Sequence, residues 1–269
     1  MSHAEPIPHI SDPGRALYER AYGQKNELLL SCLRLDRIID DITKAIGKRG
    51  WSDELFDLTE ATRQKYLQIV DTQAVGSGGS WTDYFHLMSR ASLIHETVLA
   101  PHVFADPTLH DARKNTVDGV EGVIVETLEK ALDIYDSNGL KSNDYAQLKG
   151  VINEQTTLGL LNRKQASSEL ALPASRTDDI LQGIDAVFWR MKNNQSHLFN
   201  VQVKSLVLPG QTILTKNKAV LVHNAHLGHD RQLATARLLV EECRQGLDTP
   251  ERDSLDTLSQ NLVNHVIRR

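Results

Sequence analysis

A change in hydrophobic periodicity near residue 141 constrains the fold of this chain more than any other feature of its sequence. Before that point, apolar residues recur at the three- and four-residue spacing of amphipathic helices. After it, short apolar runs of strand character are separated by turn-prone segments. The chain has 269 residues, enough for one large domain or two small ones. We therefore expect a helical domain over residues 1–140 and a second domain that contains strands over residues 141–269.

The first half is expected to be all-helical. Gly47 is interpreted as a helix stop, Ser52 as the N-cap of the next helix and Pro101 as a block to helix extension. Asn138 and Gly139 are expected to close the last helix of this half. The sequence predicts helices over residues 26–46, 52–70, 82–99 and 117–135.

The second half is expected to alternate helix and strand. A helix is predicted over residues 144–164 and another over 231–244. Strands are predicted over residues 169–172, 180–189, 198–208 and 219–222, with a turn at 192–196 between the second and the third. This order is typical of an α/β layer, so the whole chain is expected to be α+β.

Charge is distributed unevenly along the chain, although the formal net charge is only -5. Residues 1–140 hold 22 acidic and 14 basic side chains, whereas residues 141–247 hold 13 basic and 9 acidic ones. The net charge argues against a general nucleic-acid binder, but a mildly basic segment suits a polyanionic substrate. The acidic helical half is a candidate surface for a protein partner.

Composition also bounds the setting of the protein. Cys32 and Cys243 are too few and too far apart for a disulfide framework or a cysteine metal site. No run approaches the roughly 20 apolar residues of a membrane helix. The N-terminus lacks the basic and then apolar pattern of a secretory signal. The sequence therefore predicts a cytoplasmic chain without a membrane partner.

Three polar residues of the predicted second and third strands are expected to share one face of a hairpin. Period-two alternation over residues 180–189 places Asp185 inside an otherwise apolar strand. In the next strand, Gln202 and Lys204 lie on one face, whereas Val201 and Val203 lie on the other. If the two strands pair, Asp185, Gln202 and Lys204 meet on one surface.

Glu154 is the fourth member of this constellation. At 100° per residue, it lies beside Val151, Leu158 and Leu161 on the helix that precedes the strands. An acid among aliphatic side chains is costly unless a counter-charge neutralises it. A structural alternative is an ion pair between Glu154 and Arg163 or Lys164.

A divalent cation would neutralise such a cluster. Mg²⁺ prefers oxygen ligands, and Mn²⁺ can take its place. The carboxylates of Glu154 and Asp185, the amide oxygen of Gln202 and the backbone carbonyl of Val203 are candidate ligands. Lys204 would lie beside the attacking water and offset the charge that develops on a phosphoryl group. These residue types suit phosphodiester hydrolysis.

The pattern resembles the PD-(D/E)xK superfamily of restriction-endonuclease-like nucleases. The resemblance rests on Gly183-Ile184-Asp185, on Val201-Gln202-Val203-Lys204-Ser205 and on the preceding helix with Glu154, and it covers roughly 100 residues. It implies an αβββαβ core within residues 141–269 and a Mg²⁺-dependent nuclease that acts on DNA in preference to RNA. The implied catalytic residues are Glu154, Asp185, Gln202 and Lys204. Gln202 departs from the family pattern, where Glu or Asp is usual, and a neutral amide should weaken metal affinity.

Further residues are candidates for substrate contact or for other chemistry. Asp178 and Asp179 are interpreted as caps of a turn. The series His223, His226 and His229 admits a zinc-dependent hydrolase as another hypothesis. A further alternative is an inactive nuclease-like core that serves as a protein-interaction module. Candidate substrate-binding residues beside the site are Ser205, His223, Arg231 and Gln232.

Overall fold

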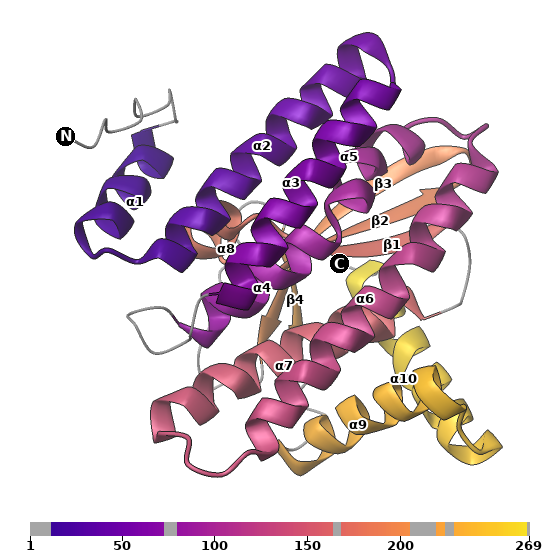
Figure 1. The fold of residues 1–269 in the computed structure, drawn as a ribbon. Coiled ribbons are helices and arrows are strands. Elements are labelled where there is room, and N and C mark those ends of the chain that lie inside the picture. The colour runs from indigo at the N-terminus through magenta and orange to yellow at the C-terminus, as the bar shows by residue number, and fades with distance from the viewer. Residues whose placement is uncertain (1–11, 73–79, 164–167, 205–218, 224–228, 268–269) are drawn as a thin grey trace.

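The computed structural model describes residues 12–72, 80–163, 168–204, 219–223 and 229–267. Helices dominate, and one mixed sheet accompanies them, so the α+β class expected from the sequence is confirmed. Figure 1 shows the long helices α2 and α3 at the upper left of the strands β1 to β3, and α6 packed against α7. The helices α9 and α10 close the lower side of the molecule in this view.

Over residues 12–136, the regular elements that the structure describes are all helices. Their bounds are α1 Asp12–Gly23, α2 Glu27–Arg49, α3 Asp53–Thr72, α4 Trp81–Ser92, α5 Ile94–Val103 and α6 His110–Asp136. Ser52 caps α3 as expected, because its hydroxyl accepts a hydrogen bond from the backbone amide of Leu55. Ser80 caps α4 in the same way through Asp83.

Two boundaries in this half differ from the prediction for identifiable physical reasons. Gly47 lies inside α2, and an added Cβ there would be 3.2 Å from Cε1 of His102, so this glycine permits close approach of α5. The helix ends instead at Gly50, which has a φ of 79°. The helix expected over residues 82–99 is divided at Leu93, and Pro101 lies inside α5 rather than beyond its end. Helix α5 continues for only two residues after that proline.

The second half contains the sheet. Its elements are α7 Ser142–Asn162, β1 Glu169–Pro173, α8 Arg176–Gln182, β2 Ala186–Lys192, β3 Gln195–Lys204, β4 Ala219–His223, α9 His229–Gln245 and α10 Thr249–Ile267. The strand expected over 180–189 is wrong in its first part, because residues 180–182 belong to α8. The Ser175 hydroxyl caps α8 through the amide of Asp178, and Gly183 ends it with a φ of 67°.

The four strands lie in the order β1-β2-β3-β4. Pairing is antiparallel from β1 to β3 and parallel between β3 and β4. The turn between β2 and β3 contains Asn193 and Asn194, both with positive φ, as a two-residue hairpin requires. Residues 205–218, which connect β3 to β4, lie outside the described residues, so a helix between these strands, as in an αβββαβ core, is not observed. Helix α9 follows β4.

Helix α7 is buried on nearly all sides and not only on the predicted face. Its buried residues include Val151, Leu158 and Leu161, as expected, but also Asn153 and Gln155 on other faces. It packs against α4, α6, α9, α10 and β1. Its last residue, Asn162, exchanges two hydrogen bonds of 2.7 Å with the backbone of Ala171 in β1. These bonds fix the first strand to the end of the helix.

The apolar core crosses the expected boundary at residues 140 and 141. One cluster contains residues of the five helices from α2 through α6, together with Leu148 and Val151 of α7 and residues of α9 and α10. A second cluster joins Phe104 and Ile124 of the first half with Phe188 and other residues of the sheet and with α10. The division into two domains stays a prediction, and both halves share this interior.

Candidate functional site

Asp185 lies between β1 and β3, immediately before β2. Its backbone amide donates to the carbonyl of Val201 at 2.9 Å, and its carbonyl accepts from Ala174 at 3.1 Å. Its Oδ2 then accepts a 2.6 Å hydrogen bond from the backbone amide of Val203. A side-chain oxygen thus replaces the next main-chain acceptor of the ladder. This contact holds the carboxyl group against the last residues of β3.

The Gln202 side chain packs against Gly183, two residues before Asp185, because glycine leaves room for it there. An added Cβ at Gly183 would be 2.5 Å from Nε2 of Gln202, so any other residue at that position would displace the Gln202 amide. The positive φ of Gly183 also turns the chain from α8 toward β2. One glycine therefore serves both the turn and the placement of the amide.

Glu154 reaches the same place from the middle of α7. Its side chain is half-buried, although its neighbours on the helix are almost fully enclosed. Burial raises the pKa of Glu154 well above its usual value, and the charges of Asp185 and Asp179 raise it further. Arg176 and Lys204 act in the opposite direction. The helix and the sheet therefore bring Glu154 close enough to Asp185 and Lys204 for their charges to interact.

The Asp185 carboxyl is perturbed by the same neighbours. Burial is the main cause that raises the pKa of Asp185 to about 7, and Asp179 adds to the rise. The hydrogen bond from Val203 and the charge of Lys204 lower it. Desolvation and like-charge repulsion both favour the neutral form of a carboxyl group. Glu154 and Asp185 would therefore need more nearby positive charge for both carboxyl groups to be ionised.

Asp179 belongs to this cluster, which the sequence did not indicate. Asp178 acts in the cap of α8, as expected, but Asp179 forms an ion pair with Arg176 and raises the pKa of the Asp185 carboxyl group. The useful signal was the spacing of Arg176 and Asp179, which is one helical turn. That signal becomes visible only when residues 176–182 are assigned to a helix.

Arg176 links the site to the helical half. Its guanidinium pairs with buried Asp83 of α4, with 2.8 Å between Nη2 and Oδ1. Its backbone amide donates to Asp36 of α2 at 2.7 Å, and Asp36 also pairs with Arg90 at 3.1 Å. Arg90 donates in turn to the carbonyl of Pro173 at the end of β1. Charged groups from α2, α4 and α8, with a main-chain carbonyl of β1, thus form one buried network beside the carboxyl cluster.

His86 of α4 lies close to this network. Its Nε2 is buried without a hydrogen-bond partner among the described residues. Burial lowers the pKa of His86 well below its usual value, and the charges of Arg176 and Arg90 lower it further. The imidazole is therefore held neutral.

Lys204 and Val203 occupy opposite faces at the end of β3. Lys204 is exposed and Val203 is buried, as the predicted alternation requires. The amide of Val203 faces Asp185, so its carbonyl also lies on the β2 side of β3. Ser205 lies outside the described residues.

The other predicted contact residues are more scattered. His223 pairs with Lys204 in the register of β3 and β4, whereas His226 lies outside the described residues. On α9, which begins at His229, Arg231 is exposed and Gln232 is buried. Only the backbone of His223 and His229 is described.

The ion pair considered between Glu154 and Arg163 does not form. Arg163 is buried and instead pairs with Glu242 of α9 and with Asp256 of α10. Lys164 lies outside the described residues.

The candidate ligands are of the kind that a hard cation prefers, although few of them are acidic. Two carboxylates, an amide oxygen and a main-chain carbonyl are all oxygen donors, which Mg²⁺ prefers. Within the described ranges, no three His, Cys, Asp or Glu side chains are grouped so that they could hold a metal ion. A cation here would depend on Gln202 and Val203 in addition to Glu154 and Asp185.

Comparison of the chain with protein-family models, with curated proteins and with solved structures finds no match. In the part of the chain that the structure describes, no helix combines the length and the apolar character needed to cross a membrane.

Proposed function

We propose that the chain is a Mg²⁺-dependent nuclease that hydrolyses phosphodiester bonds, with DNA as the preferred substrate. The observation that carries the proposal is the convergence of Glu154 from α7 with Asp185 and Lys204 from the sheet. These are the residues on which the resemblance to the PD-(D/E)xK superfamily rests. The finer proposal of a restriction-endonuclease-like core within residues 141–269 depends on the same convergence.

The raised pKa values of the two carboxyl groups support a cation at this place. Both carboxyl groups are desolvated and repel each other, so a divalent ion would stabilise their ionised forms. Mg²⁺ would be held by Glu154, Asp185, Gln202 and the carbonyl of Val203. When bound, the ion would lower the pKa of a coordinated water and polarise a phosphoryl oxygen.

The protein's own residues would position the reaction. Lys204 is exposed at the end of β3, where its ammonium group can donate to the attacking water and offset charge on the phosphate. Asp185 and Gln202 are only half-buried, so a substrate can approach them from solvent. Asp185 is fixed by the amide of Val203, which limits its rotation. Arg176 lies behind the carboxyl cluster and holds Asp179.

Nuclease assays on the purified chain with Mg²⁺ or Mn²⁺ test this proposal. We expect plasmid or linear DNA to be cut, and Asp185→Asn or Lys204→Ala to lower the rate by about 100-fold or more, because each removes a group needed at the reacting phosphate. Lys192→Ala is the matched control, since Lys192 is an exposed lysine at the other end of the same hairpin.

A specific result would contradict the proposal. The proposal of hydrolysis at this site is wrong if no substrate is cut. It is also wrong if wild type, Asp185→Asn, Lys204→Ala and Lys192→Ala all cut at the same rate. The neutral amide of Gln202 would then favour the alternative of an inactive core that binds a protein partner through the acidic helical half. Circular dichroism of each variant establishes that a lost activity is not a lost fold.

A further inference from the structure

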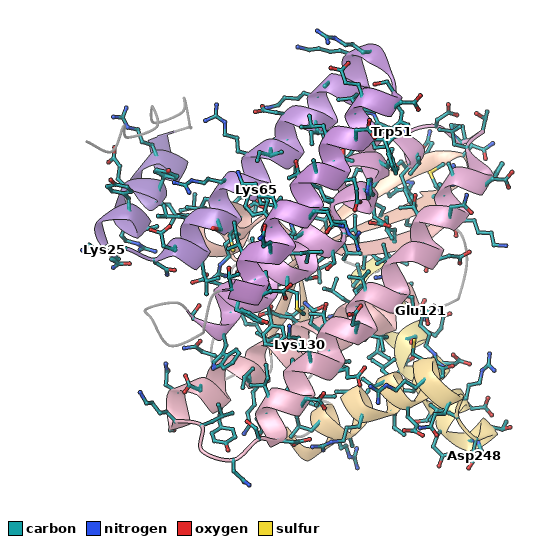
Figure 2. All side chains as sticks on the ribbon, in the orientation of Figure 1. Lys25, Trp51, Lys65, Glu121, Lys130 and Asp248 are labelled. Carbon is teal, nitrogen blue, oxygen red and sulfur yellow. The ribbon has the colours of Figure 1, made fainter. Side chains whose placement is uncertain are left out.

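A large cavity lies away from the carboxyl cluster, between the end of α2, the connection that follows it, α5 and the start of α6. Its volume is about 820 Å³, within the range of pockets that take small organic molecules. Figure 2 labels Trp51, which lies in the connection between α2 and α3 and lines this cavity. Leu99, Val103 and Leu109 contribute apolar walls.

Glu96 of α5 contributes a carboxyl group to the lining of this cavity. Its Oε2 is buried and has no hydrogen-bond partner among the described residues. Its Oε1 packs against α6 at Gly119, where an added Cβ would be only 2.8 Å away. Burial raises the pKa of Glu96, because its own backbone amide, His95 and Arg63 offset the loss of solvent only in part. A buried carboxyl oxygen without a donor destabilises the fold unless something binds to it.

The rings of Trp51 and His95 line the same cavity as Glu96. The ring of His95 stacks on Phe56, with centroids 5.0 Å apart, and Trp51 meets both rings edge-on. The Nε2 of His95 is engaged by Glu60 at 3.1 Å, and this contact fixes the imidazole. Trp51 and Phe56 are exposed although both are large and apolar. Aromatic faces of this kind attract cations as well as apolar groups.

The remaining polar groups of the cavity favour a positive ligand. His102 is held by the carbonyl of Thr43, to which its Nε2 donates, so its Nδ1 is an acceptor. Asp106 adds a second carboxylate to the lining, and Lys48 adds one ammonium group. Carboxylates therefore outnumber cationic side chains in the lining.

We propose that this cavity binds a small organic cation, an amine with an apolar body. Its ammonium group donates to Glu96, and its body packs against Trp51 and Leu99. An inorganic cation would leave the apolar walls without a partner, and an organic anion would meet the carboxylates. The site shares no residue with the proposed nuclease centre and does not depend on that activity.

Isothermal titration calorimetry with three compounds of matched shape tests the proposal on the full chain. We expect phenethylamine to bind, and 2-phenylethanol and phenylacetate to bind at least about tenfold more weakly, because only the amine gives the carboxylate a charged donor. Quenching of tryptophan fluorescence by the amine, lost in Trp51→Phe, would place it in this cavity.

Two glutamate variants complete the experiment. We expect Glu96→Gln to weaken phenethylamine binding by at least about tenfold. Glu126 is an exposed glutamate on α6 outside the cavity, so Glu126→Gln should leave the binding unchanged. Equal binding of the amine and the alcohol, or no saturation by the amine at millimolar concentration, overturns the proposal. The comparison of compounds on the wild-type chain decides the matter even if Glu96→Gln does not fold.

Discussion

Asp185 is held in a position that is unfavourable for its ionised form. Its backbone completes the β2–β3 ladder, and its side chain accepts from the amide of Val203, so it cannot turn away from Glu154 or Asp179. The pKa of Asp185 is consequently raised to about 7. Functional sites often keep such perturbed groups because ligand binding offsets their cost.

This pKa makes stability depend on pH with a definite sign. The native state keeps the Asp185 proton up to about pH 7, whereas the unfolded chain releases it near its ordinary value of 3.8. The contribution of this group to stability is therefore present below about pH 4 and is lost as the pH rises through about 7. We expect Asp185→Asn to be more stable than wild type at pH 8 by on the order of 3 kcal/mol, and by much less at pH 4.

Urea denaturation of both proteins at pH 4 and pH 8 measures this difference. The lowered pKa of His86 makes both proteins less stable as the pH falls below 6.5, the opposite trend to that of Asp185. This effect cancels in the difference between wild type and Asp185→Asn, because both proteins contain His86. Addition of Mg²⁺ at pH 8 should stabilise wild type more than the variant. A stability difference that does not change with pH would contradict the buried environment described for Asp185.

At the scale of elements, α8 joins the two halves of the molecule. It is a single short helix, but Arg176 in its first turn reaches Asp83 of α4 and Asp179 on its own helix. We expect Arg176→Met to lower the free energy of unfolding by about 3 kcal/mol, because it leaves the buried Asp83 carboxylate without its charged partner.

Arg237→Met is the matched control for this change. Arg237 pairs with Asp136 at 2.8 Å, but both side chains are about half exposed, so its loss should cost less than about 1 kcal/mol. Chemical denaturation of the two variants measures both costs. Equal losses would mean that the network around α8 contributes no more than a surface ion pair.

The elements also show which parts of the fold the sequence could reveal. Long amphipathic helices such as α2 and α6 and the hairpin at Asn193 were predicted, because their periodicity and turn residues are local signals. Helix α8 was not predicted, because Ile180 and Leu181 continue the apolar run of β2 and the cap at Ser175 is a weak competing signal. Pro101 misled the prediction, because a proline near a helix end removes one hydrogen bond and does not prevent a final turn.

The part of the candidate site that could be predicted is the part where alternation along a strand determines on which face of the sheet a side chain lies. Gln202 and Lys204 point away from Val201 and Val203, as that rule requires. Asp179 was missed because its position follows from the unpredicted helix. The network at Arg176 is formed by residues far apart in the chain, and no local pattern indicates such pairs.

At the scale of the whole molecule, the two halves share their interior. Leu128 and Ala131 of α6 lie in one apolar cluster with Leu148 of α7 and Leu239 of α9. A fragment of residues 141–269 would expose these contacts to water. We expect it to lack cooperative unfolding by circular dichroism, because burial of apolar area supplies most of the stability of a domain.

Co-expression of residues 1–140 with this fragment is the control. Recovery of a cooperative transition in the reassembled pair would show that the missing contacts, and not the cut itself, caused the loss. A fragment that melts cooperatively alone would establish the boundary at residues 140 and 141 as a true domain border.

The enclosure of α7 limits how this protein can change over time. Leu148 and Leu160 face one apolar cluster, Leu158 and Leu161 face the other, and Glu154 lies between them on the same helix. A shift of α7 that changes the position of the Glu154 carboxyl group would disturb the packing of both apolar clusters. Both the helical half and the sheet pack on the helix that carries Glu154, so replacing either one would require new packing around the carboxyl cluster.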